Sequence, residues 1–216
     1  MRFTEHEMVF FNSITKGDSV FGIPLKFRPE NSHEEEVKNT INGLMGKGVL
    51  KSETELSVQG AVAARALECY KESTKHVIIN YLHIAFLEKK DAVVIVPLKN
   101  REYELLRLPR AALFYLLLEQ YPVLRNAAKE VNQKIELEDM DAFLQELKKY
   151  DGNIMVGEFQ QGTLVREQVC FWKEERIYWY DLNRQVRKEM NTVQTRRELL
   201  KLLEINEEVE QYGRAY

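Results

Sequence analysis

Four histidines are the side chains best suited to proton transfer or metal binding, and they are spread along the first part of the chain. His6 and His33 fall at the expected starts of two helices. His76 and His83 lie seven positions apart in a segment with strand character, and an odd separation on one continuous strand puts two side chains on opposite faces. The pattern therefore predicts no shared metal site and a structural or solvated role for each ring.

The cysteines and the glycine-rich stretch carry no recognisable chemistry either. Cys69 and Cys170 lie far apart and form no CxxC pair, so a buried, reduced thiol is expected for each. The stretch GLMGKG, residues 43–48, lacks the GxxxxGK[ST] spacing of a phosphate-binding loop, because no Ser or Thr follows Lys47.

Glu138, Asp139 and Asp141 open a predicted helix, where the helix dipole favours negative side chains without any acid–base role. Taken together, these residues predict no catalytic site, no metal site and no cofactor. The chain is expected not to be an enzyme, and an enzyme of unknown type ranks third among the functions considered.

Aromatic side chains concentrate in VCFWKEERIYWYDLN, residues 169–183. Rings on a sheet stack nucleic-acid bases when arginines and lysines lie between them. Here the basic residues of the KEER turn are offset by two glutamates. The period of two along a strand puts Tyr178 and Tyr180 on one face and Trp179 on the other, so most of these rings are expected in the sheet and its core.

The overall charge argues against a nucleic-acid partner. Net charge is -3, whereas broad nucleic-acid binding needs a basic patch that displaces counterions from phosphates. The N-terminal residues MRFTEHEMVF carry carboxylates where a secretory signal would be apolar, and AALFYLLL, residues 111–118, is too short for a membrane span. A cytoplasmic protein with no membrane span is predicted.

Helices are predicted from Glu5 to Ile14, where Thr4 and Glu7 fit a capping box, and from about Val58 to Glu72, with Val62, Ala66, Cys69 and Tyr70 packed inward. The second half offers a further strand over residues 186–193 and a final helix from Thr195 to Tyr212.

A helix is also predicted from Ser32, with Glu35 completing a capping box. The tract GLMGKGVLKSETELSVQG that ends it resembles the end of a winged-helix unit, in which a helix runs into KGxL and a small wing. The residues that carry this likeness are Leu44, Lys47, Gly48, Val49 and Leu50. Three glutamates at 34–36 would repel phosphates at the start of that helix. A winged-helix transcription regulator is therefore the alternative function rather than the first.

A quasi-repeat organises the rest of the chain. IAFLEKKDAVVIV, residues 84–96, aligns with VCFWKEERIYWYD, residues 169–181, at a constant offset. Both segments alternate strands with tight charged turns between helices. The sequence predicts an α+β fold, in which a helical, winged-helix-like N-terminal unit precedes two helix–meander–helix halves that share one antiparallel sheet. The predicted parts are residues 1–75, 76–132 and 133–216, packed as one compact domain.

This layout is similar to that of the EspG family of type VII secretion chaperones, and to cytosolic proteins encoded beside type VII secretion genes in Gram-positive bacteria. The segments that carry the resemblance are FTEHEMVFFNSI, KHVIINYLHIAFLEKKDAVVIVPL and VREQVCFWKEERIYWYDL. The likeness implies a non-enzymatic cytosolic adaptor that binds helical secretion substrates, masks an apolar tip of the client and guides it to the export machinery.

In that family the loop between the second and third strands of a meander helps to grip the client. The matching residues here are Lys99, Asn100, Arg101 and Glu102, which the resemblance implies as the partner-binding site. The second half has no equally clear third strand, so a symmetric second site is not expected. The sequence leaves open the client, a homodimer, and any nucleic-acid role of the winged-helix-like segment.

Overall fold

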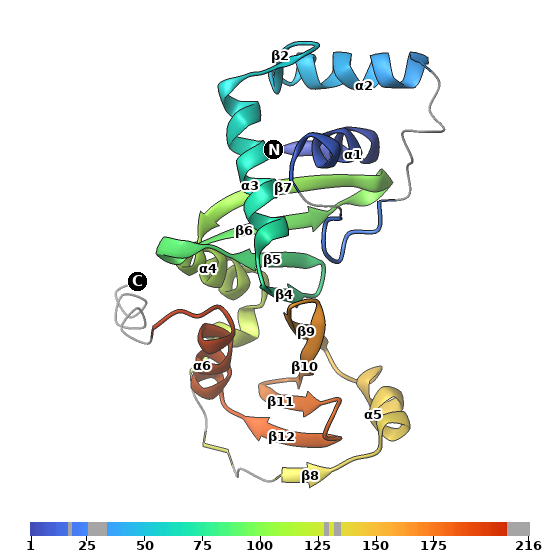
Figure 1. The fold of residues 1–216 in the computed structure, drawn as a ribbon. Coiled ribbons are helices and arrows are strands. Elements are labelled where there is room, and N and C mark those ends of the chain that lie inside the picture. Colours follow the sequence, from blue (N-terminus) through green and yellow to red (C-terminus); the bar gives the residue numbers. More distant parts are fainter. Residues whose placement is uncertain (17–18, 26–33, 128–129, 132–134, 207–216) are drawn as a thin grey trace. The chain divides into compact units, whose positions relative to one another are not determined.

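The structure is a computed structural model of the chain. It shows an α+β protein with a large antiparallel sheet, as predicted, and with six α-helices in the part described (Figure 1). The described residues are 1–16, 19–25, 34–127, 130–131 and 135–206.

The chain divides into two compact units whose boundaries lie within the β-strands. The first unit comprises Met1–His76 and Tyr81–Arg107, and the second comprises Val77–Asn80 and Leu108–Tyr216. The N-terminal helices therefore group with the strands of the first predicted meander.

The first unit combines three helices with strands in the order β1-β7-β6-β5. Its elements are β1 (Arg2–Thr4), α1 (Glu5–Ile14), α2 (Glu34–Gly46), β2 (Leu50–Ser52), β3 (Glu55–Leu56), α3 (Val58–Glu72), β5 (Leu82–Phe86), β6 (Asp91–Pro97) and most of β7 (Glu102–Pro109). The ammonium group of Met1 donates to the carbonyl of Leu105 at 2.8 Å, which fixes β1 beside β7.

Side chains satisfy the backbone groups at both ends of α1. Thr4 and Glu7 form the predicted capping box, in which the Glu7 amide donates to Thr4 Oγ1 at 3.3 Å and the Thr4 amide donates to the Glu7 carboxylate at 2.7 Å. At the other end, Lys71 of α3 donates to the carbonyl oxygens of Asn12 and Thr15. These bonds hold α1 against α3, next to the buried apolar side chains of the first unit.

Helix α3 approaches the chain before it closely at Gly60. A Cβ at this position would lie 2.0 Å from the carbonyl oxygen of Val49, so a larger residue would push the helix away. The buried face of α3 continues through Ala63, Leu67 and Tyr70. Val62 was predicted to point inward, and this is wrong: it lies off that stripe and is 59% exposed.

The second unit places its strands in the order β4-β9-β10-β11-β12-β8. Its elements are most of β4 (Lys75–Ile79), α4 (Arg110–Gln120), β8 (Ile135–Leu137), α5 (Met140–Leu147), β9 (Gly152–Gln160), β10 (Thr163–Lys173), β11 (Arg176–Asp181), β12 (Val186–Met190) and α6 (Thr192–Leu202). The sequence offered a further, less clear strand over residues 186–193, and β12 is that strand, well paired with β11.

The predicted alternation of the aromatic stretch is confirmed. Phe143 of α5 stacks on Tyr180 with ring centroids 3.9 Å apart, and Phe171 and Tyr178 lie in the same cluster. Trp179 points to the other face of the sheet, as its odd position requires. These rings fill the sheet and its core, so they offer no exposed platform for stacking bases.

Two local expectations about helix ends need correction or lie outside the described residues. Helix α6 begins at Thr192 rather than at the predicted Thr195, because Asn191 and Gln194 form a capping box ahead of it. Ser32 and the predicted end of the last helix, residues 207–212, lie outside the described part of the chain. The small hairpin β2–β3 does follow α2, but the winged-helix and repeat descriptions stay predictions.

Candidate functional site

The turn predicted to bind a partner connects β6 to β7 in the first unit. Lys99–Arg101 form a short 3-10 helix, in which Asn100 and Arg101 adopt left-handed backbone angles with φ of 61° and 57°. The guanidinium of Arg101 lies 3.4 Å from the carboxylate of Glu5, and Glu102 lies opposite Thr4 in the antiparallel ladder of β1 and β7. The side chains of Lys99 and Asn100 are exposed and make no hydrogen bond or ion pair among the described residues. Of the four residues, these two are the ones free to meet a partner.

His76 lies near the start of β4 and His83 lies in β5, and both residues belong to the first unit. The chain reverses between them at Asn80, which has a φ of 52°, so the argument from one continuous strand does not apply. His76 is bonded through Nε2 to the carbonyl of Tyr70 at 3.0 Å and stacks on Phe21. Burial lowers the pKa of both rings, and the charge of His76 lowers that of His83 further. Both rings are therefore neutral at pH 7.

The two cysteines differ in their surroundings: Cys170 is buried as expected, whereas Cys69 was also expected to be buried and is partly exposed. Cys69 and Cys170 are free thiols, and complete burial raises the pKa of Cys170 far above its usual range. A thiol in this state is a poor nucleophile. Among the described residues, no group of three or more His, Cys, Asp or Glu side chains is arranged to hold a metal ion.

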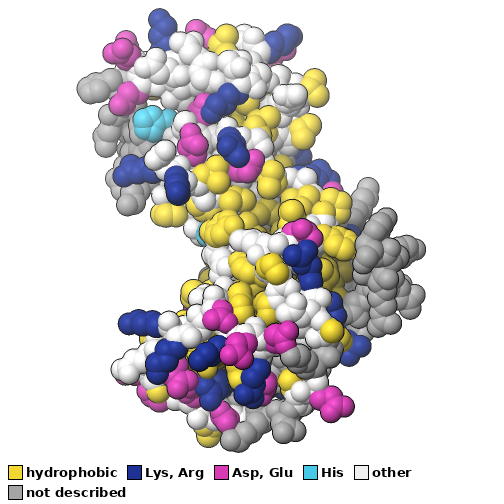
Figure 2. All heavy atoms as spheres, turned by 180° about the vertical axis from the view of Figure 1, so that it is seen from behind, with side chains coloured by type: hydrophobic (Ala, Val, Ile, Leu, Met, Phe, Trp, Pro, Cys, Tyr) yellow, Lys and Arg dark blue, Asp and Glu magenta, His cyan; other side chains and the backbone are white. Residues whose placement is uncertain are grey.

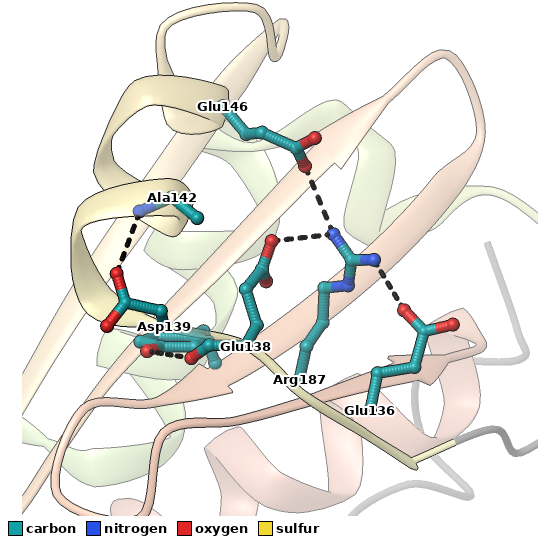
Figure 3. A network of polar contacts seen from close by, with 7 residues as sticks. Glu136, Glu138, Asp139, Ala142, Glu146 and Arg187 are labelled. Carbon is teal, nitrogen blue, oxygen red and sulfur yellow. Dashed lines mark hydrogen bonds and ion pairs between the residues drawn. The ribbon is translucent and has the colours of Figure 1, made fainter.

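A network of charged side chains surrounds Arg187 of β12 (Figure 3). Its guanidinium contacts the carboxylates of Glu136 in β8, of Glu138, and of Glu146 in α5; the last two lie 3.2 Å away. Burial raises the pKa of Glu138, although the charge of Arg187 opposes this. Asp139 caps α5 next to the network, accepting a hydrogen bond from the amide of Ala142 at 3.3 Å.

The Arg187 network serves to anchor the fold rather than to transfer protons. One guanidinium joins the edge strand β8 and the helix α5 to β12, and each carboxylate already has a cationic partner. The prediction that acidic residues cap this helix is confirmed for Asp139. The ion pairs were missed because Arg187 lies 41 to 51 positions away from its partners in sequence.

A strip of apolar residues lies on one face of the strands of the second unit; Met155 and Leu164 are exposed, and Phe159 is half-buried. Met155, Gly157 and Phe159 alternate along β9, and Leu164 of β10 lies opposite Phe159 in the ladder, so all four share a face. Met155 is 47% exposed. The Phe159 ring covers Gly157, where a Cβ would lie 3.0 Å from it. We call these four residues the apolar strip; their period of two was the signal that sequence reasoning passed over.

The apolar strip continues the face on which α5 packs. Met155 lies opposite Val169, which belongs to the core cluster around Phe143. Leu144 of α5 is 47% exposed beside that cluster, and it lines a shallow depression together with Asn153 of β9. Asp141, Gln145 and Lys148 also line this depression, so the surface beside Leu144 is a mixture of polar and apolar groups.

The charged side chains form no patch of a single sign on the face seen in Figure 2, where basic and acidic groups are intermixed. Such a surface lacks the basic stripe that would track a phosphate backbone. None of the helices in the described residues is both long enough and apolar enough to cross a membrane.

Comparison with curated proteins gave no match. A family model described as a domain of unknown function, DUF5081, matches residues 1–211, which is nearly the whole chain. The chain therefore belongs to the DUF5081 family.

Proposed function

We propose that this protein is a non-enzymatic cytoplasmic adaptor that binds an amphipathic helix of a partner protein. The resemblance to EspG chaperones names the partner class, a secreted helical client of a type VII secretion system. The observation that carries the proposal is the apolar strip, in which Met155 and Leu164 are exposed on the β9–β10 hairpin beside the half-buried Phe159.

A helix fits the strip better than an extended peptide does. Helix α5 already covers the inner part of this sheet face, and a partner helix beside it would continue the same layer over Met155, Phe159 and Leu164. An amphipathic helix presents apolar side chains at i, i+3, i+4 and i+7, which suits contact with the side chains of Met155, Phe159 and Leu164 on one sheet face. Each large apolar side chain that becomes buried contributes about 1.5–3 kcal/mol before the cost of association.

The layout of the chain also supports the resemblance. A helix, a run of strands and a second helix occur as α3, β5–β7 and α4, and again as α5, β9–β12 and α6. In both cases a strand from earlier in the chain, β1 or β8, pairs with the last strand of the run. We infer from this that the two halves follow one plan, as the aligned hairpins suggested.

The β6–β7 turn has a secondary role in this proposal. Lys99 and Asn100 form a charged, exposed tip, and charges at the rim of an interface mainly set the association rate and the specificity. Arg101 is a poorer probe of binding, because it also holds Glu5.

The proposal is tested by identifying the chain that co-purifies from the native host and measuring its helices as labelled peptides by fluorescence anisotropy. Replacing Met155 and Leu164 by Asp should weaken binding by at least about tenfold, because the contact loses apolar area and gains charge. Val62→Asp, on an exposed residue of the first unit, is the matched control and should bind like the parent. Equal binding by a folded M155D/L164D variant, or no binding by any helical peptide, would reject the proposal.

A transcription regulator is the second candidate, favoured by the hairpin β2–β3 that follows α2 like a small wing. Glu34–Glu36 at the start of α2 argue against it. Salt-sensitive binding to duplex DNA at physiological salt would favour the regulator.

A further inference from the structure

A polar pocket lies in the second unit, on the face of its strands opposite the apolar strip. It has a volume of about 250 Å³ and is bounded by β10, β11, β12 and α6. Trp179 and Lys188 face each other across the β11–β12 ladder and line it, whereas Tyr180 and Arg187 point to the other face. This volume is below the roughly 300–1,000 Å³ of drug-sized sites, so the pocket suits one small molecule or one side chain.

Both acidic groups of the lining already accept hydrogen bonds, and Glu198 is also paired with two cations. Glu198 accepts from Arg166 at 3.0 Å and from Lys201 at 3.1 Å; burial opposes its ionisation, but these bonds outweigh burial and lower its pKa. Asp181 accepts from Gln168 at 3.3 Å and also from two backbone amides in the following turn.

Two basic groups of the lining, in contrast, have no such partners among the described residues. Arg184 and Lys188 form no ion pair or side-chain hydrogen bond within the described residues, although both border the pocket. Trp179 is 6% exposed, and its indole Nε1 is buried with no hydrogen-bond partner in that part of the chain. Gln168 has the complementary feature, a buried Oε1 with no donor. Buried polar groups are costly unless they are satisfied, so these atoms mark a place for a polar ligand.

We propose that this pocket binds a carboxylate that carries a neighbouring hydrogen-bond donor. The carboxylate accepts from Trp179 Nε1 and pairs with Lys188 and Arg184, and the donor of the ligand satisfies Gln168 Oε1. The same chemistry comes from two sources, a free hydroxy acid or a glutamate side chain with its peptide N–H. This site lies on the other face of the sheet from the apolar strip, so it stands independently of the helix-binding proposal.

The test follows the two tryptophan indole N–H signals by two-dimensional NMR, with Trp179→Phe used to assign the signal of Trp179. One arm adds 3-hydroxybutyrate, with its neutral amide as control. The other adds a capped pentapeptide with one central glutamate, with the glutamine peptide as control. We expect the Trp179 signal to move with a carboxylate ligand below about 10 mM, while that of Trp172 and the neutral controls change little.

Two variants connect the shift to the proposed contacts. Lys188→Met and Arg184→Met each remove a cation that has no ion-pair partner among the described residues, and each should weaken binding by about tenfold, because a charge-assisted hydrogen bond is lost. A response only to the hydroxy acid identifies a free metabolite, and a response only to the peptide identifies a protein side chain. The proposal is overturned if no carboxylate moves the Trp179 signal, or if folded variants bind as tightly as the parent.

Discussion

The two compact units differ in where their charged and titratable side chains lie. Among the described residues, the buried carboxylates and the buried histidine, Glu5, Glu7 and His76, all belong to the first unit. In the second unit the largest buried side chains are aromatic or aliphatic, and charged groups gather at the margins, around Arg187 and in the polar pocket. The first unit should therefore respond to protonation of its interior, and the second to loss of packing and of its peripheral ion pairs.

The largest expected loss of stability comes from a substitution in the aromatic core of the second unit. Phe143→Ala removes a ring that is 1% exposed and stacked on Tyr180, and it should lower the free energy of unfolding by about 3–5 kcal/mol. Trp179→Phe, on the opposite face, should cost less than about 1.5 kcal/mol, because it also removes an unpartnered buried donor. Urea denaturation measures both, and equal losses would contradict the contrast between the two faces.

Arg187→Met should cost about 2–3 kcal/mol at pH 7, because it leaves three carboxylates together without their cation. Burial already raises the pKa of Glu138, so this group favours the folded state at low pH and loses that advantage as pH rises. The deficit of the variant should therefore shrink between pH 7 and pH 5 in chemical denaturation. A constant deficit over this range would show that electrostatic repulsion is not its cause.

The histidines of the first unit predict an opposite response of the parent protein to pH. The folded pKa values of His76 and His83 are lowered, so the unfolded chain takes up protons first as pH falls below about 6.5. Stability present at pH 7 is then lost on acidification. A double variant with glutamine at both positions should have a flatter pH dependence of unfolding between pH 7 and 5. An unchanged slope would assign the acid sensitivity to other groups.

The smallest effects are expected at the β6–β7 turn. Arg101→Ala should cost about 0.5–1 kcal/mol, since the ion pair with Glu5 is exposed on the arginine side. Lys99→Ala should change stability by less than about 0.5 kcal/mol, because the side chain of Lys99 holds nothing in the described structure. Thermal melts of the two variants separate a residue that supports the fold from one available for recognition.

Patterns between neighbours in sequence were read correctly. The capping box of Thr4 and Glu7 spans three residues, and the alternation of Tyr178, Trp179 and Tyr180 follows from strand geometry alone. The α+β class followed from the same local signals. The burial of Val62 was predicted wrongly, because the close contact of Gly60 with the backbone of Val49 decides which face of α3 is buried. Val49 belongs to a different segment of the chain, so the pattern within the helix does not reveal this contact.

By itself, the sequence determined most of the local elements, the aromatic alternation and the place of the turn at residues 99–102; a partner-binding role for that turn stays a prediction. Only the tertiary structure decided that Arg101 is tied to Glu5 and that Arg187 gathers three carboxylates. It also decided that Gln168 and Trp179, each with a buried polar atom that has no partner among the described residues, line one pocket. The physical reason is range. Hydrogen bonding and side-chain period act between near neighbours, whereas ion pairing and burial depend on which distant strands and helices the fold brings into contact.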